Sequence, residues 1–264
     1  MNSKQREILT KILSNKTSGS SEILSMLNTY LLHNISNRKL FHDSIPMVQS
    51  KFSHFAAINN YLHKLTGMLE LNNGDLLEEY LINFKTEENL QFKIIFGNIF
   101  NKLPSAKSIL TISKSGTLIN IFKLWHKRKS NLKLIITESR PANEGKLMAK
   151  ELLKTGLKIE LITEAMSGIF IPKLDAVIIG ADAVLKNGNV INKSGSLFLA
   201  VLCKYYKKPF YVLTTKSKFV NRNRYKISEE LSDTVWKFAH PNLRTINIPF
   251  EEIDRKLITE IISE

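Results

Sequence analysis

Residues 108–122 read SILTISKSGTLINIF, and this stretch decides which kind of fold the chain can form. Residues 109–112 are apolar and mostly β-branched, which predicts a short buried strand. Residues 113–117 (SKSGT) follow, and the apolar run after them is typical of a helix. Small hydroxyl residues, a glycine and a lysine at the start of a helix favour a bound phosphate group. We therefore expect residues 113–117 to form a loop that holds a phosphorylated ligand.

Residues 1–103 are predicted to form a helical domain. Two stretches place apolar residues at helical spacing: SSEILSMLNTYLLHN at 20–34 and TEENLQFKIIFGNIFNKL at 86–103. Ser20 or Ser21 is suited to cap the first of these helices. Neither stretch alternates between apolar and polar residues for long enough to be a strand.

Residues 104–264 have a different pattern, in which helical stretches such as 143–156 separate most of a series of short apolar segments. Those segments lie at 108–112, 132–137, 157–163, 176–182, 209–215 and 243–248. Apolar strands that alternate with helices form parallel sheets covered on both faces. The sequence therefore predicts an α/β fold, with a helical N-terminal domain (1–103) followed by a Rossmann-like, doubly wound parallel sheet (104–264).

Composition and charge restrict the classes of function. Hydrophobic residues make up 43% of the 264 residues and charged residues 23%, as in folded globular proteins. No apolar run approaches the roughly 20 residues of a membrane span, and the start lacks the apolar stretch of a secretion signal, so we expect a cytoplasmic protein. The formal net charge of +14 favours an anionic partner: nucleic acid, a phosphorylated metabolite or an acidic protein. Cys203, the single cysteine, is expected to be a buried apolar residue.

Open parallel sheets bind ligands at the carboxyl ends of their strands, and charged residues follow two more of the predicted strands. Asp182 ends the segment AVIIGAD, where it could be an acid within a pocket or merely a turn former. Asn192 and Lys193 precede a further helix entrance, and Lys216 or Lys218 follows the segment at 209–215. These residues would converge with the loop at 113–117 on one edge of the sheet.

The stretch ESRPANEG at 138–145 follows another predicted strand. Its Arg140 could hold an anion with two parallel hydrogen bonds. Arg140 could equally pair with Glu138, and the sequence leaves both interpretations open.

Three motifs carry a resemblance to a known family: ESRP..EG, GAD.....G...NK.G and the closing NIPFEEIDRKLITEIISE. They resemble the family that contains the alpha, beta and delta subunits of translation initiation factor 2B. The family also contains methylthioribose-1-phosphate isomerase and ribose-1,5-bisphosphate isomerase. The resemblance implies a helical N-terminal domain and a Rossmann-like C-terminal domain that forms a homodimer, or a heteromer with a paralogue. A translation factor is a further partner that this resemblance implies. We expect no membrane partner, metal or cofactor.

The isomerases of this family have a catalytic cysteine in a Thr-His-Cys-Asn-Ser pattern, with the aspartate of Gly-Ala-Asp as its partner. The aspartate is retained here as Asp182, but Ser113 occupies the cysteine position and Ile112 the histidine position. The isomerases' N-terminal Arg-Gly-Ala segment corresponds to residues 18–20 (SGS), so a phosphate-binding arginine is also missing, and Lys51 is a candidate replacement for a second arginine. A serine hydroxyl is a much weaker acid than a thiol, which argues against the standard isomerase reaction.

The site expected from these arguments contains Asp182 as the acid, with Ser113 in the position of the family cysteine. The residues expected to bind the ligand are Ser115, Gly116, Thr117, Arg140, Asn192, Lys193 and Lys218.

Three functions remain open. The first is a regulatory member of the initiation factor 2B family that binds a phosphorylated sugar or nucleotide without the standard isomerase chemistry. The second is an aldose–ketose isomerase acting on a sugar 1-phosphate, with Asp182 as the acid. The third is a scaffold that binds RNA or protein through its basic surface.

Overall fold

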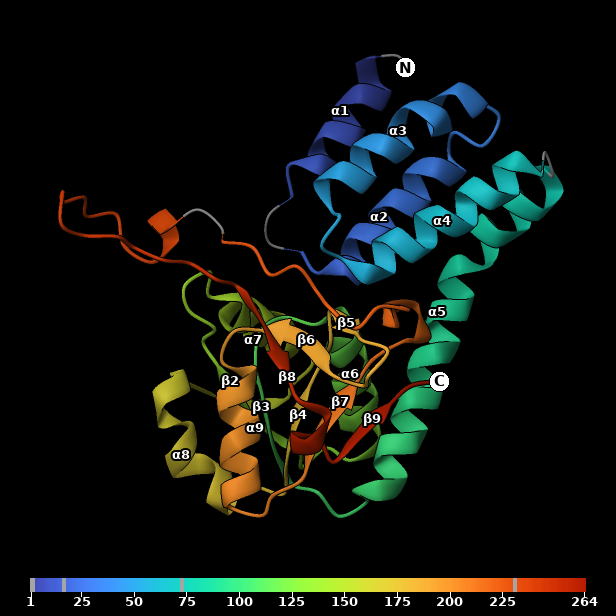
Figure 1. The fold of residues 1–264 in the computed structure, drawn as a ribbon. Helices are drawn as coiled ribbons and strands as arrows, with labels where there is room; N and C mark the ends of the chain where they lie inside the picture. The colour runs from blue at the N-terminus through green and yellow to red at the C-terminus, as the bar shows by residue number, and fades with distance from the viewer. Residues whose placement is uncertain (1–2, 16–17, 72–73, 230–231) are drawn as a thin grey trace.

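Five helices precede the first strand in the computed structural model, which describes residues 3–15, 18–71, 74–229 and 232–264 (Figure 1). These helices are α1 (Ser3–Leu13), α2 (Ser20–Leu32), α3 (Arg38–Lys51), α4 (Ala56–Glu70) and α5 (Gly74–Lys102). Their apolar faces form one core, with Leu31, Phe41, Ile58 and Leu65 fully enclosed. Apolar residues at helical spacing lie on one face of a helix, and the helices bury these faces against one another.

Helix α5 belongs to two cores. Leu77 and Leu81 near its start pack into the core of the preceding helices, whereas Ile95 and Ile99 near its end pack against the sheet. In Figure 1 this helix runs from the upper helices down along the side of the lower layer. Because one continuous helix contributes to both cores, the division into domains at residue 103 stays a prediction.

Six parallel strands form the main sheet, in the order β3-β2-β1-β4-β7-β9. In that order, the strands are Lys158–Ile162, Lys133–Thr137, Ser108–Thr111, Ala176–Ile179, Phe210–Leu213 and Glu260–Ile262. The predicted α/β fold with a parallel sheet is therefore confirmed. The strand order reverses between β1 and β4, and a ligand crevice is expected where a doubly wound sheet changes direction.

Helices cover both faces of this sheet. Helices α6 (Gly116–Arg128) and α7 (Glu144–Leu153) pack with the end of α5 against one face, around the buried Trp125. Helix α9 (Ser196–Tyr205) packs against the other face, and the short helix α8 (Ser167–Phe170) lies beside it. Side chains of β1 alternate between the two cores, with Ile109 on the α6 side and Leu110 on the α9 side. This double burial explains why the strands read as continuous apolar runs.

A second, antiparallel sheet lies above the carboxyl edge of the first (Figure 1). It contains β5 (Ala183–Val184), β6 (Val190–Lys193) and β8 (Phe250–Ile253), in that order. The segment at 243–248, expected as a strand, has no regular structure, so this expectation is wrong. The strand begins instead at Phe250, because that stretch can pair with β6 across four residues.

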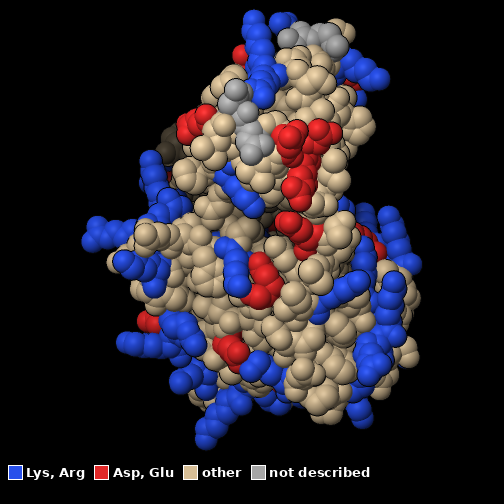
Figure 2. All heavy atoms as spheres, turned by 90° about the vertical axis from the view of Figure 1, so that its right-hand side faces the viewer, with Lys and Arg blue, Asp and Glu red and all other residues tan. Residues whose placement is uncertain are grey.

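No helix among the described residues is long and apolar enough to cross a membrane. Figure 2 shows Lys and Arg spread over much of one face of the molecule, whereas Asp and Glu gather mainly near its middle and upper part.

Candidate functional site

A cavity of about 930 Å³ lies at the carboxyl ends of β1 and β4, where the strand order reverses. From the sheet, its lining includes residues 112–116, 180–182 and 192–193. From the helical part, it includes residues 18–21 at the start of α2 and Lys51, Phe52, His54 and Phe55 between α3 and α4. The cavity is therefore built jointly by the helices of the first part of the chain and the sheet of the second.

The loop at 113–117 connects β1 to α6 along the cavity wall. Ser113 has a left-handed backbone (φ 65°), and its N–H donates a hydrogen bond of 2.7 Å to Oγ of Ser139. The Ser115 hydroxyl caps α6 by accepting from the N–H of Leu118 at 3.3 Å. The first N–H groups of a helix have no acceptor within the helix, so those of Ser115 and Gly116 are available for an anion.

Gly180, directly after β4, packs so closely against the loop at 113–117 that only glycine fits there. A Cβ atom at this position would lie 2.8 Å from Oγ and 3.0 Å from Cβ of Ser115. A side chain at residue 180 would therefore displace the loop from the cavity wall.

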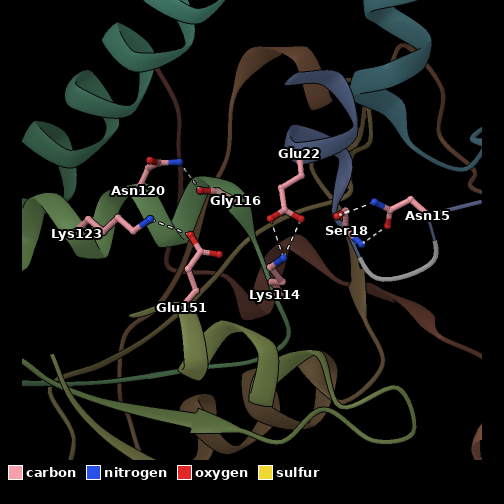
Figure 3. Close-up of polar contacts among 8 residues, drawn as sticks. All are labelled: Asn15, Ser18, Glu22, Lys114, Gly116, Asn120, Lys123 and Glu151. Carbon is pink, nitrogen blue, oxygen red and sulfur yellow. Dashed lines mark hydrogen bonds and ion pairs between the residues drawn. The ribbon is translucent and has the colours of Figure 1, made fainter. Parts of the chain in front are cut away.

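Contacts with α2 hold the other side of the loop (Figure 3). Nζ of Lys114 contacts both carboxylate oxygens of Glu22 at 2.8 Å. Just before α2, the amide of Asn15 both donates to Oγ and accepts from the N–H of Ser18. The helical part of the chain therefore helps to position the loop at 113–117.

Asp182 and Lys218 form the charged centre of the cavity. Burial raises the pKa of the Asp182 carboxyl above its ordinary value, although the charges of Lys218 and Lys193 oppose this shift. Burial also lowers the pKa of the Lys218 ammonium, against the effect of the Asp182 carboxylate. Lys218 is 5% exposed, and its Nζ donates to the carbonyl of Ala181 at 2.6 Å. Burial thus shifts both groups toward their neutral forms, and such perturbed pKa values are frequent at functional sites.

Asn192 and Lys193 lie at the end of β6 and are both buried. The amide of Asn192 donates to Oγ of Ser196 at 2.9 Å. Nζ of Lys193 forms an ion pair with Glu144 and lies 5.0 Å from the centre of the Phe250 ring. Lys193 therefore presents its charge to the cavity but already has a partner there.

His54 is a cavity residue that the sequence did not indicate. It lies between α3 and α4, and its ring is 4.1 Å from that of Phe55. Burial lowers the pKa of its imidazole, and the Asp182 carboxylate acts in the opposite direction. The hydroxyl of Tyr225 donates to the backbone carbonyl of His54. No motif marks a lone histidine 128 positions before its acidic partner, so only the folded chain reveals this pair.

The expected residues do not all line the cavity. Ser113, Ser115, Gly116, Asp182, Asn192, Lys193 and Lys218 do, and so do Lys51 and residues 18–20. Thr117 is fully buried behind the loop instead. Arg140 lies outside this lining and donates to the carbonyl of Val235 at 3.0 Å, whereas Glu138 pairs with Lys146 and not with Arg140. Anion binding by Arg140 stays a prediction.

Cys203, the single cysteine, lies on the core-facing side of α9, and burial raises the pKa of its thiol to about 12. The cavity therefore has no thiol for acid–base chemistry. No group of three or more His, Cys, Asp and Glu suited to a metal ion occurs within residues 3–15, 18–71, 74–229 and 232–264.

The chain belongs to the initiation factor 2 subunit family, whose sequence profile matches residues 13–264. It is 36% identical over 229 residues to a translation initiation factor eIF-2B subunit 2-like protein of Pyrococcus abyssi, covering 85% of this chain and 81% of that protein. Over 213 residues it is 30% identical to methylthioribose-1-phosphate isomerase of Caenorhabditis briggsae, covering 71% of this chain and 58% of the isomerase. The resemblance seen in the motifs is confirmed, and the family contains both kinds of protein.

Solved structures show the same fold. The translation initiation factor eIF-2B of Pyrococcus horikoshii superimposes with a TM-score of 0.83 at 24% identity, covering 100% of this chain and 96% of that one. The 5-methylthioribose 1-phosphate isomerase of the same organism gives a TM-score of 0.80 at 19% identity, covering 98% and 82%. A subunit of the tetrameric eIF2B-beta2-delta2 complex of C. thermophilum gives 0.79 at 15% identity, covering 100% and 91%.

The coupling between Asp182 and His54 can be measured directly. Replacing Asp182 by Asn removes the carboxylate that raises the His54 pKa, so the imidazole pKa should fall further below its ordinary value. An NMR titration of the His54 ring measures this pKa. The matched control is Asp175→Asn, which removes a carboxylate at the opposite end of β4 and should leave the His54 pKa unchanged. An unchanged pKa in Asp182→Asn would show that the two groups are not coupled.

Proposed function

We propose that this protein binds a phosphorylated sugar or nucleotide in the cavity and acts as a regulatory member of its family, without the standard isomerase reaction. One observation carries the proposal: a helix N-terminus and buried lysines face the same cavity at the reversal point of the sheet. Helix N–H groups and ammonium groups together bind phosphate. Asp182 provides an oxygen acceptor for a sugar hydroxyl beside them.

The chemistry of the loop argues against the standard reaction. Opening the ring of a sugar 1-phosphate and moving a proton between carbons needs an acid of suitable pKa. Ser113 provides a hydroxyl where the family's isomerases have a thiol, and Ile112 is an apolar neighbour where they have a histidine. Since Cys203 is buried elsewhere, no thiol replaces the missing one.

Sugar-phosphate isomerisation is the second candidate, and the position of His54 favours it. This histidine and Asp182 line the same cavity and influence each other's pKa. An imidazole and a carboxyl group in one cavity could share the transfer of a proton between neighbouring carbons.

Ligand-dependent unfolding tests binding. Ribose 5-phosphate or adenosine 5′-monophosphate should raise the unfolding temperature, whereas ribose should not. At 100 times the Kd, the free energy of unfolding should rise by about 2.7 kcal/mol. Lys193→Ala should lose this stabilisation, and Lys186→Ala, on an exposed turn outside the cavity, should retain it. Equal stabilisation of both variants would contradict the proposed site.

Turnover of methylthioribose 1-phosphate and ribose 1,5-bisphosphate separates the two candidates. The proposal expects no turnover at ordinary enzyme rates, either by the natural protein or by Ser113→Cys, because Ile112 and residues 18–20 also depart from the enzyme pattern. Efficient turnover by the natural protein, abolished by Asp182→Asn, would establish the isomerase. If neither binding nor turnover occurs, the function lies on the basic surface.

Self-association through α9 is part of the proposal. Leu199, Ala200 and Cys203 of this helix face the core, whereas Phe198 and Val201 are 43% and 49% exposed. Large apolar residues on the open face of a helix suit contact with a second copy of the chain or with a paralogue. The relative from C. thermophilum, whose structure is of a tetrameric complex, agrees with such assembly.

Sedimentation tests this association at micromolar concentration. The natural protein should sediment as a dimer, and Val201→Asp should shift it to a monomer because a carboxylate would be buried without a partner. Leu90→Asp, which places the same charge at an exposed apolar position on α5, should leave the dimer intact. A monomeric natural protein would rule out the homodimer.

A further inference from the structure

Lys193 is a lysine of the cavity whose charge is paired with a carboxylate before any ligand binds. It ends β6, is 9% exposed, and its ammonium is held between the Phe250 ring and the Glu144 carboxylate. A buried ammonium without a partner is costly, so the folded chain supplies an anion of its own. Any other anion that binds to Lys193 has to compete with this carboxylate.

Glu144 is well placed to act as that internal anion. It is the first residue of α7, where the helix N-terminus favours a negative charge. Only one of its carboxylate oxygens is used: Oε1 contacts Lys193, whereas Oε2 is buried without a hydrogen-bond partner. The unpaired Oε2 leaves part of the desolvation cost of the Glu144 carboxylate uncompensated, so the ion pair stabilises the fold less than a fully hydrogen-bonded pair would.

Lys114 and Lys218, two other lysines of the lining, have partners of a different kind. Lys114 contacts Glu22, which lies on α2 and outside the cavity lining. Lys218 donates to a carbonyl group rather than to a carboxylate. Among the ion pairs of the described residues, Lys193–Glu144 is the one in which both partners line the cavity. Separating the two side chains would therefore change the charge that a ligand meets there.

We propose that Glu144 is a specificity-determining residue, an internal counter-ion that a ligand must displace from Lys193. A ligand carboxylate has the same charge as the Glu144 carboxylate. It cannot displace Glu144 from Lys193, because Glu144 is held beside Lys193 by the fold and therefore has a high effective concentration there. A phosphate monoester near pH 7 carries a charge of about −1.5 to −2 and three acceptor oxygens, so it can compete. This inference rests on the proposed function and deepens it: the site selects phosphorylated ligands over sugar acids.

Calorimetric titration with ribose 5-phosphate and with D-ribonate, a sugar acid of similar size, tests the inference. The natural protein should bind ribose 5-phosphate and not D-ribonate. Glu144→Gln should bind ribose 5-phosphate about tenfold more tightly, because a competing charge close to Lys193 is gone. The same variant should also gain measurable binding of D-ribonate.

Two further variants serve as controls. Glu151→Gln removes a carboxylate of the same helix that pairs with Lys123 at 2.8 Å outside this cavity (Figure 3), and it should match the natural protein. Adding Lys193→Met to Glu144→Gln should remove both gains, because the released ammonium is then absent. If Glu144→Gln folds poorly, as judged by its unfolding temperature without ligand, Glu144→Ala provides the same comparison.

The outcomes separate this inference from the proposed function. If the natural protein binds ribose 5-phosphate and Glu144→Gln binds neither ligand more tightly, the counter-ion role is wrong and the proposed function stands. If only Glu144→Gln binds ribose 5-phosphate, the counter-ion role is supported and the proposed function fails for the natural protein. If neither protein binds either ligand, both fail.

Discussion

Charges buried at the carboxyl edge of the sheet impose the main constraint on this protein, because each has to be compensated within the fold. Asp182, Lys193 and Lys218 lie there, and burial acts on the pKa of both Asp182 and Lys218 in the direction of the neutral form. Their compensation draws on separate parts of the chain. Lys218 donates to a carbonyl after β4, Lys193 pairs with a carboxylate at the start of α7, and the charges of these two lysines act on Asp182. Correct assembly of the charged cavity therefore depends on correct packing of all these elements.

The same dependence explains why the helical part matters to a site on the sheet. Strand order reverses between β1 and β4, which opens a crevice above their ends. The helices close that crevice and contribute Glu22 to the loop and His54 to the cavity. Helix α5, which enters both cores, joins the two parts along their side. A change in the packing of the helices would therefore alter the charges around a ligand.

The strands of the main sheet that follow clear local patterns could be predicted from the sequence. Five of the expected segments, at 108–112, 132–137, 157–163, 176–182 and 209–215, contain β1, β2, β3, β4 and β7. The inner strands could be predicted because buried parallel strands are continuously apolar, whereas the edge strand β3 is largely exposed. The short strand β9 and the antiparallel strand β8 could not be predicted from the sequence, since they pair with strands far away in the chain. Position after a strand indicated Ser115 and Asp182, and position before a helix entrance indicated Lys193; all three line the cavity. Position could not show that Thr117 faces the core, that Arg140 reaches Val235, or that His54 and Glu144 enter the cavity.

A crystal structure of the protein with ribose 5-phosphate tests the central claim most directly. The account predicts that the phosphate lies within hydrogen-bond distance, about 3 Å, of the N–H groups of Ser115 and Gly116 and of Nζ of Lys193. It also predicts that a sugar hydroxyl contacts Asp182. A phosphate bound instead to lysines on the outer surface, with the cavity holding only water, would contradict it.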